Sequence, residues 1–291
     1  MGEPLVSVVI PTYNRAAMLR EAIASVLAQT YRHWELIVVD DGSQDDTPAV
    51  VQAFGSQLTY LRQAHAGVSA ARNRGAAAAR GELLAFLDSD DLWLPQKLAA
   101  QVALLQRRPQ VAACYTDEIW VRCGVRVNPR QVHRKFSGWI FFQSLPRCVI
   151  SPSSVLLRRC LWQQLGGFNE TLPACEDYDL WLRLTLRAPV YLVPQRLIVK
   201  RGGHGDQLSR TIPVLDQYRI AALEKCLAYP LTPLQRRAVL WHLVRKCTIV
   251  AQGACKRGQQ ARWQRYHAKA LYYRQQLGGQ GVAHRGAGLW L

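Results

Sequence analysis

Short apolar runs rich in β-branched residues alternate with segments of helical periodicity along about the first 110 residues. The apolar runs are residues 5–10, 34–39, 58–62 and 83–87. They predict strands buried on both faces of a sheet. The periodic segments predict helices at about 15–29, 67–80 and 95–107, and Asp46-Thr47-Pro48 opens another. This alternation predicts an α/β fold with a mostly parallel, twisted sheet flanked by helices.

Polar residues follow three of these four strands. Thr12-Tyr13-Asn14 follows the first, Asp40-Asp41 the second and Asp88-Ser89-Asp90-Asp91 the fourth. In such sheets ligands bind at the carboxyl ends of the strands, so we expect these residues to share one site. Asn14 is expected to cap helix 15–29, Gly81 to end helix 67–80, and Pro95 to lie in the first turn of the last helix.

Asp88, Asp90 and Asp91 place three carboxylates within four residues after a buried strand. Like charges packed so closely are unfavourable unless a cation neutralises them. Oxygen ligands suit Mg²⁺ or Mn²⁺, and such an ion also binds a diphosphate. The alternative is a solvated acidic turn, and Asp91 is expected to cap the next helix. Neither a dinucleotide-binding glycine signature nor a Walker loop occurs, so phosphate is expected to be held through the metal and side chains.

Several motifs in order along the chain resemble family 2 glycosyltransferases, which are inverting enzymes with the GT-A fold. The donor-half motifs are Pro11-Thr12-Tyr13-Asn14-Arg15, Val38-Val39-Asp40-Asp41-Gly42-Ser43, Gly67-Val68-Ser69-Ala70-Ala71-Arg72-Asn73-Arg74-Gly75 and Phe86-Leu87-Asp88-Ser89-Asp90-Asp91. The acceptor-half motifs are Gly166-Gly167-Phe168 and Glu176-Asp177-Tyr178-Asp179-Leu180-Trp181-Leu182-Arg183. The resemblance covers about residues 5–210.

This resemblance implies a site for a nucleotide-sugar donor, with a UDP-sugar favoured. The residues it assigns to that site are Pro11, Thr12, Tyr13, Asp40, Asp41, Arg72, Asp88 and Ser89. Pro11 and Tyr13 would wall the nucleobase pocket, and Asp40 would accept a hydrogen bond from the base. Asp88 would approach the ribose. Asp40 can instead cap the following turn, and Arg72 can be an ordinary surface arginine on a helix.

The resemblance also implies a metal site and a catalytic base. Asp90 would bind Mn²⁺ or Mg²⁺, and His204 is a second candidate ligand whose alternative is an exposed loop residue. Asp177 would remove the proton from the acceptor hydroxyl, and Glu176 would orient that hydroxyl. Both acidic residues open an apolar-periodic stretch, so we expect them at a helix N-terminus, where the dipole favours the ionised form. The alternative is a merely structural acidic first turn.

The pattern changes after residues 205–213. Segments 214–228, 233–252 and 259–277 predict helices, which divides the chain into a catalytic domain at 1–210 and a basic helical region at 211–291. Residues 196–291 hold 17 Lys and Arg but only 3 Asp and Glu. Aromatic residues among these charges suit an anionic membrane surface. Simple helix packing and a solvated basic face are the alternatives, and nucleic acid is ranked last.

The remaining features bear on location and on competing functions. The chain has no signal-like start, no apolar run of about 18 residues, and eight scattered cysteines that suit reduced thiols. We therefore expect a cytoplasmic protein, and the basic region favours a peripheral position on the inner membrane. The resemblance implies an enzyme that transfers a sugar to a glycan or lipid-linked acceptor in cell-envelope polysaccharide synthesis. The alternatives are a nucleotidyltransferase, or an inert protein of this fold that docks membrane or nucleic acid through its basic region.

Overall fold

The computed structural model describes residues 2–203, 205 and 211–278. The chain divides into two compact units, of which the first extends to Pro213 and the second begins at Val214. Each unit has its own packed interior, and each is described below by itself.

The first unit is built on a nine-stranded sheet with the order β3-β2-β1-β4-β8-β6-β9-β5, in which β7 pairs with β6. The strands are β1 Val6–Thr12, β2 Trp34–Asp40, β3 Thr59–Arg62, β4 Leu83–Phe86, β5 Leu92–Trp93, β6 Ala113–Arg122, β7 Val125–Val127, β8 Val155–Arg158 and β9 Val190–Gly202. The four strands predicted from the sequence are β1 to β4, and they run parallel to one another. The later strands add antiparallel pairs at β4–β8, β6–β8 and β5–β9.

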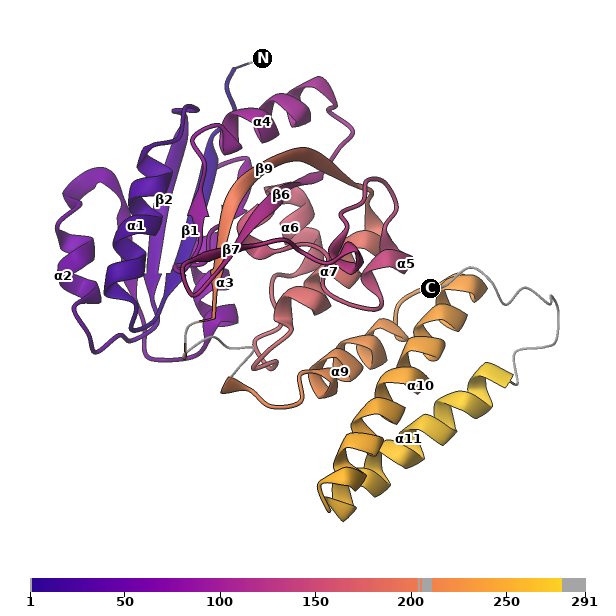
Figure 1. The fold of residues 1–291 in the computed structure, drawn as a ribbon. Helices are drawn as coiled ribbons and strands as arrows, with labels where there is room; N and C mark the ends of the chain where they lie inside the picture. Colours follow the sequence, from indigo (N-terminus) through magenta and orange to yellow (C-terminus); the bar gives the residue numbers. More distant parts are fainter. Residues whose placement is uncertain (1, 204, 206–210, 279–291) are drawn as a thin grey trace. The chain divides into compact units, whose positions relative to one another are not determined.

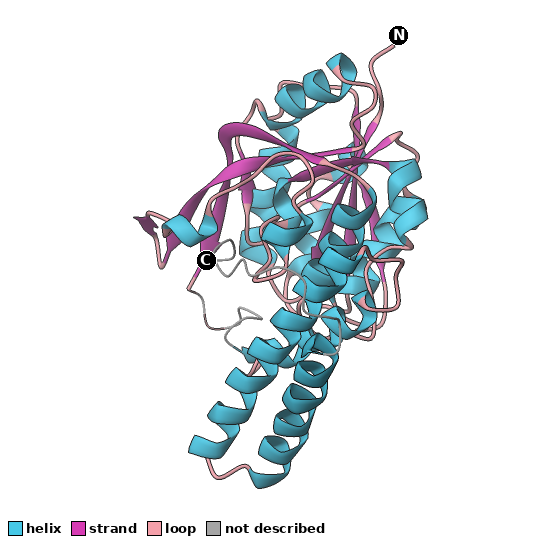
Figure 2. Ribbon diagram, turned by 90° about the vertical axis from the view of Figure 1, so that its right-hand side faces the viewer, coloured by secondary structure: helices cyan, strands magenta, loops and turns pink. Residues whose placement is uncertain are grey.

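Helices cover both faces of this sheet (Figure 1). They are α1 Ala16–Leu27, α2 Thr47–Gln52, α3 Val68–Ala78, α4 Lys97–Arg107, α5 Phe141–Ser144, α6 Arg159–Leu165 and α7 Glu176–Arg187. Along β1, Val8 and Ile10 pack in one apolar cluster with α1 and α4, whereas Val9 packs in the other with α3, α6 and α7. Because strand side chains alternate between faces, a strand covered on both sides must be apolar throughout. Figure 2 shows the strands lying between helices.

Three predicted helix boundaries are wrong in detail. Arg15, not Asn14, is the N-cap of α1, while Asn14 has a φ of 50° and its side chain accepts a hydrogen bond from the Gln44 amide at 2.7 Å. Helix α3 ends at Ala78 rather than at Gly81. Gly81 instead lies against β1, where an added Cβ would be 2.6 Å from the Leu5 carbonyl oxygen. Pro95 precedes α4, which begins at Lys97.

The second unit contains α9 Asp216–Cys226, α10 Pro233–Lys256 and α11 Gln260–Gly278, which confirms the three predicted helices. Helix α10 opens with a capping box in which Thr232 and Gln235 exchange side-chain and backbone hydrogen bonds. Tyr266 and Tyr273 of α11 are buried between the helices, so packing accounts for these two aromatic residues. Among the described residues, no helix is both long and apolar enough to cross a membrane.

One buried lysine in the first unit lacks a carboxylate partner among the described residues. Lys97, at the start of α4, is fully buried, and its Nζ donates to Gln101 Oε1 at 2.7 Å. The ammonium also lies 3.8 Å from the centre of the Trp93 ring. A desolvated cation–π contact contributes only about 2 kcal/mol. Burial therefore dominates and lowers the pKa of Lys97 to about 7.

Replacing this lysine is expected to stabilise the fold. Lys97→Met should raise the free energy of unfolding by about 1 kcal/mol at pH 6, because a charge-burial cost of about 5 kcal/mol exceeds the sum of a lost hydrogen bond of about 2 kcal/mol and a lost cation–π contact of about 2 kcal/mol. Lysine in an unfolded chain titrates near about 10.4, so between about pH 7 and 10 the unfolded state binds the extra proton and wild-type stability rises with pH. The Lys97→Met variant should lack this rise in stability with pH.

Urea unfolding at pH 6 and 9 measures both effects, with exposed Lys256→Met as the control. A variant less stable than wild type at pH 6 would contradict the prediction.

Candidate active site

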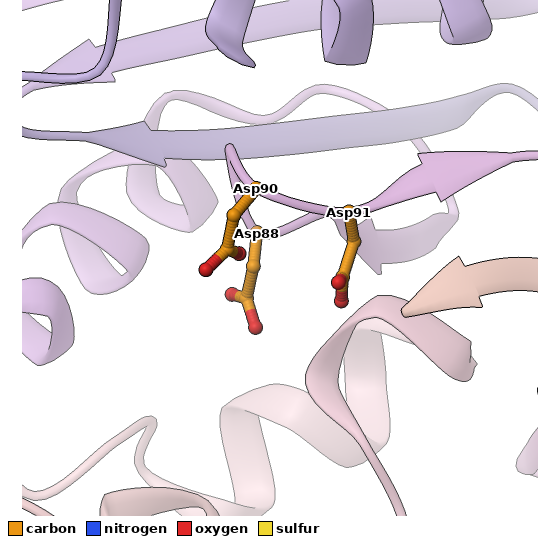
Figure 3. Close-up of side chains that lie close together, drawn as sticks. All are labelled: Asp88, Asp90 and Asp91. Atoms are coloured by element: carbon orange, nitrogen blue, oxygen red, sulfur yellow. The ribbon is translucent and has the colours of Figure 1, made fainter. Parts of the chain in front are cut away.

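Three aspartates gather at the carboxyl end of β4, in the turn that leads to β5. Asp88, Asp90 and Asp91 each offer a carboxylate oxygen within 4.8 Å of the others. In Figure 3 their side chains project to the same side of this turn. Asp88 and Asp90 are partly exposed, and Asp90 accepts from the Arg15 guanidinium at 2.7 Å. The predicted gathering of these carboxylates is therefore present.

Asp91 differs from its two neighbours. It is buried, its Oδ2 accepts from the Ser153 hydroxyl at 2.6 Å and its Oδ1 from the Arg201 amide at 3.0 Å. Burial, together with the charges of Asp90 and Asp88, raises the pKa of Asp91 well above its usual range. The prediction that Asp91 caps the next helix is wrong, because Gln96 is the N-cap of α4. Asp91 instead ties β9 to the aspartate turn.

The guanidinium of Arg72 connects this turn to a distant part of the chain. Arg72, on α3, is buried, and it donates to Asp88 Oδ1 at 2.6 Å and to Glu176 Oε1 at 2.7 Å. It also lies 4.9 Å from the centre of the Phe168 ring. Burial alone would lower the pKa of Arg72, but the two carboxylates outweigh it and raise the pKa. The guanidinium is therefore always charged. The alternative interpretation, that Arg72 is an ordinary surface arginine on a helix, is wrong because Arg72 is buried.

Glu176 and Asp177 lie in the first turn of α7, as predicted. Burial raises the pKa of Glu176, although Arg72 opposes this effect. Asp177 is partly exposed, and its Oδ1 accepts from the Tyr178 amide at 2.6 Å. Its Oδ2 accepts from the Cys148 thiol at 3.2 Å. Burial and the neighbouring Asp177 charge raise the pKa of Cys148 well above its usual range, so the thiol keeps its proton and donates.

The end of β1 presents one exposed ring and one unpaired hydroxyl. Pro11 and Thr12 are buried, and Thr12 Oγ1 is a buried oxygen with no hydrogen-bond partner in the described parts of the chain. Tyr13 is 40% exposed and stacks on His65 with ring centroids 4.2 Å apart. An unpaired buried hydroxyl and an exposed aromatic face are both features that a bound nucleotide can use.

Asp40 and Asp41, at the end of β2, are buried and shape the loops around them. Asp40 accepts from the Ser43 amide at 2.8 Å and from the Tyr60 hydroxyl at 2.6 Å, so it caps the following turn, which is the alternative left open by the sequence. Asp41 accepts from the amides of residues 66 and 67, at 2.9 and 2.8 Å. The proposed contact of Asp40 with a nucleobase stays a prediction, and a carboxylate has further lone pairs for it.

Ser89 is buried in the aspartate turn, between Asp88 and Asp90. His204, the second candidate metal ligand, lies outside the described residues.

Sequence reasoning missed Lys200, which follows from the position of β9. Burial would lower the pKa of Lys200, but the charges of Glu118, Asp91 and Asp177 outweigh it and raise the pKa. One ammonium therefore lies near both the aspartate turn and the start of α7. The available signal was that Lys200 directly follows the apolar run Leu197–Val199. Ser153 and Cys148 were missed as well, because each contact joins residues at least 29 positions apart.

The arrangement fits a divalent cation. Asp88 and Asp90 supply hard oxygen donors from one turn, and both are accessible. Burial is the main cause of the raised pKa of Asp91, and the charges of Asp90 and Asp88 add to it; a bound cation would offset this repulsion among the three carboxylates. The site thus combines a turn whose carboxylates suit a cation, an aromatic ring at its edge, and a partly exposed carboxylate at a helix N-terminus.

Comparisons with known proteins agree with this geometry. The sequence profile of Glycosyl transferase family 2 matches residues 7–159. An uncharacterized glycosyltransferase of Rickettsia typhi is 32% identical over 226 residues, covering 74% of this chain and 69% of the relative. The UDP-Glc:alpha-D-GlcNAc-diphosphoundecaprenol beta-1,3-glucosyltransferase of Escherichia coli is 34% identical over 186 residues, covering 63% of this chain and 71% of the relative.

A solved structure supports the fold. TarS of Staphylococcus aureus, in complex with UDP-GlcNAc, superposes with a TM-score of 0.73 over 90% of this chain and 79% of that chain, at 20% identity. This likeness confirms the predicted fold, a sheet flanked by helices with further helices after it. The profile covers more than half of the sequence, and the Rickettsia relative is similar over most of its own length. The chain therefore belongs to glycosyl transferase family 2 and is a glycosyltransferase.

Proposed function

We propose that this enzyme transfers a sugar from a UDP-sugar, with inversion, to a hydroxyl of a glycan or lipid-linked acceptor, and that it uses Mn²⁺ or Mg²⁺. The observation that carries the proposal is the bridge from Asp88 through Arg72 to Glu176, because it makes the aspartate turn and the start of α7 one site. The choice of UDP is supported by the substrate of the E. coli relative and by the ligand of the TarS structure. A lipid-linked acceptor in cell-envelope synthesis is likewise supported by the name of that relative.

In this proposal Asp88 and Asp90 hold the metal. Asp91 is left out, because both of its oxygens already accept hydrogen bonds. A divalent cation bound there supplies positive charge to the departing diphosphate. Arg15 donates to Asp90 in this structure. When the metal and the donor are bound, we propose that its guanidinium turns to the negatively charged diphosphate. His204 stays a predicted second ligand.

The nucleotide is proposed to lie at the ends of β1 and β2. Tyr13 offers its exposed face to the uracil ring, and the unpaired Thr12 hydroxyl is a donor for a nucleotide oxygen. Pro11, Asp40 and Ser89 are buried beneath this surface, so their proposed contribution is to shape it. Asp41 holds the loop that carries the stacked ring of His65, since it accepts from the amides of residues 66 and 67.

The transfer step is proposed to use Asp177 as the base. The acceptor oxygen forms a bond to the anomeric carbon, the bond from that carbon to the diphosphate breaks, and its electron pair leaves with UDP. The hydroxyl proton passes to the Asp177 carboxylate, which lies in the first turn of α7. The Glu176 carboxylate is paired with Arg72, which fixes its position. In this proposal it orients the acceptor hydroxyl from that position. No contact among the described residues favours the inert binding-protein alternative.

Metal-dependent nucleotide binding is the first test. UDP is expected to raise the melting temperature only when Mn²⁺ or Mg²⁺ is present, because the diphosphate needs the cation to approach the aspartates. Asp90→Asn should abolish this shift, since it removes a charged metal ligand, while exposed Asp46→Asn should keep it. Differential scanning fluorimetry with UDP, GDP, CDP and TDP, each with and without metal, measures the effect. Equal stabilisation by UDP in wild type and Asp90→Asn, or no shift with any nucleotide, would refute the proposal.

Loss of the base should separate chemistry from donor binding. Asp177→Asn is expected to lower kcat by about 10²–10⁴, the usual contribution of a general base. It should leave the UDP-dependent melting shift unchanged, because Asp177 lies on the acceptor side of Arg72. The assay is UDP release from the best-stabilising UDP-sugar, with an envelope lipid extract as the source of acceptor. A variant with wild-type turnover would show that Asp177 is not the base.

The basic region is proposed to contact an anionic membrane through α10. Most of its exposed residues recur every three or four positions and so share one helix face. They are Leu234, Arg237, Trp241, Arg245, Ile249, Gln252 and Lys256. This stripe mixes large apolar side chains with basic ones and contains no acidic residue, and the Arg245 guanidinium lies 5.5 Å from the centre of the Trp241 ring. Such a face suits the boundary between lipid headgroups and acyl chains. A peripheral location on the inner membrane follows from it.

Vesicle flotation tests the stripe. Wild type is expected to float with vesicles that contain anionic phospholipid and not with neutral ones. Arg237→Gln/Arg245→Gln should weaken this binding by about 10- to 30-fold, at about 1 kcal/mol for each basic residue. Arg107→Gln/Arg187→Gln removes two exposed charges from the first unit and serves as the control. If wild type fails to float at moderate salt, or if both double variants lose binding equally, the stripe is not a membrane surface.

A further inference from the structure

Residues 122–147, here called the strap, leave the end of β6 and return beside the start of α7. The strap is firmly held to the sheet. The Tyr115 hydroxyl donates to the Phe136 carbonyl at 2.6 Å and accepts from the Phe136 amide at 2.8 Å. Gly138 pairs with Val190 through two backbone hydrogen bonds. The strap therefore presents a defined surface, and its side chains can form a site.

The charge of this surface has one sign. The strap contains six Lys and Arg residues and one His, and no Asp or Glu occurs between Glu118 and Glu170. Among the described residues of the first unit, the exposed large apolar side chains are Tyr13 and three on the strap, namely Val125, Val132 and Trp139, which are 66%, 53% and 63% exposed. A surface that is both cationic and apolar matches a molecule with an anionic group next to a hydrocarbon chain.

The cations converge around His133. Its ring lies 4.8 Å from that of Trp120, and the Arg122 guanidinium lies 5.8 Å from the Trp120 ring. Arg147 donates a hydrogen bond to the Val132 carbonyl, next to His133. Burial lowers the pKa of His133, and the charges of Arg147 and Lys135 lower it further.

The carboxylate that acts on His133, that of Glu118, is already engaged. Glu118 accepts from Lys135 Nζ at 3.1 Å and from Trp120 Nε1 at 2.9 Å. The remaining cations, Arg122 and Arg147, therefore leave a net positive site that an anion can fill.

This positive site adjoins the proposed base. Arg147 is followed directly by Cys148, whose thiol donates to Asp177 Oδ2 at 3.2 Å. Lys200 interacts electrostatically with Glu118 and Asp177, so the cluster and the base share a positively charged neighbour. The chain thus runs directly from Arg147, at the end of the strap, to the residue whose thiol contacts the Asp177 carboxylate.

We propose that the strap binds the phosphate of an acceptor in which phosphate or diphosphate joins the accepting sugar to a hydrocarbon chain. Arg122 and Arg147 bind the phosphate oxygens, and Val132 and Trp139 contact the hydrocarbon. The proposal rests on the proposed function, because it takes Asp177 as the base. It names the chemical class of the acceptor and the residues that select it.

The test uses geranyl diphosphate and inorganic pyrophosphate as probes. The full chain is first saturated with UDP and Mn²⁺, so that the donor site is filled, and binding is measured by titration calorimetry. Geranyl diphosphate is expected to bind more tightly than pyrophosphate. Arg147→Gln should weaken both by about tenfold, the loss of one charge-assisted contact. Val132→Ser/Trp139→Ser should weaken only geranyl diphosphate. Arg122→Gln should weaken binding of both probes as Arg147→Gln does, without removing a hydrogen bond to the backbone. Exposed Arg107→Gln is the control and should bind both probes as wild type does.

Each contrary result has a definite meaning. If UDP with Mn²⁺ stabilises the chain but geranyl diphosphate does not bind, or binds equally to all variants, the inference is wrong and the proposed function stands. If these variants instead lose only binding to anionic phospholipid vesicles, the strap recognises membrane headgroups and the proposal is overturned. If UDP with Mn²⁺ produces no stabilisation, the proposed function fails and the inference falls with it.

Discussion

The buried guanidinium of Arg72 is the interaction on which the site depends. It is taken out of water, and it keeps its charge because Asp88 and Glu176 meet it at 2.6 and 2.7 Å. Removing one partner of such a buried group costs about 3–5 kcal/mol, because an unpaired charge remains. Neither carboxylate can therefore move far from Arg72. The aspartate turn after β4 and the first turn of α7 are fixed to one another through α3.

This constraint fixes the two halves of the first unit relative to each other at the site. The parallel strands β1 to β4 deliver the polar turns, and the mixed part of the sheet carries Ser153 and Arg201 to Asp91 from the other side. The strap then ends at Arg147, directly before Cys148, whose thiol donates to Asp177. The proposed donor side and acceptor side are thus joined by contacts between residues far apart in the sequence, and the transfer chemistry lies where they meet.

The sequence predicted what depends on local patterns. The alternation of strands and helices, the polar ends of β1, β2 and β4, and the position of Glu176 and Asp177 in a helical first turn all follow from neighbouring residues. The rest depends on long-range contacts. Arg72 meets Glu176 across 104 positions, and Asp91 meets Ser153 across 62, so neither pairing leaves a local signal. The contact of Asp40 with the Tyr60 hydroxyl joins residues 20 positions apart and likewise leaves no local signal, whereas its proposed contact with a nucleobase stays a prediction.

The most direct measurement of this account is a double-mutant cycle on Arg72 and Glu176, read as unfolding free energies in urea. Arg72→Met should cost about 3–5 kcal/mol by leaving two carboxylates facing each other without a cation. Adding Glu176→Met to that variant should recover part of the loss, which gives a coupling energy of at least about 1 kcal/mol. Additive effects of the two substitutions would contradict the account, because they would mean that Arg72 does not tie the aspartate turn to α7.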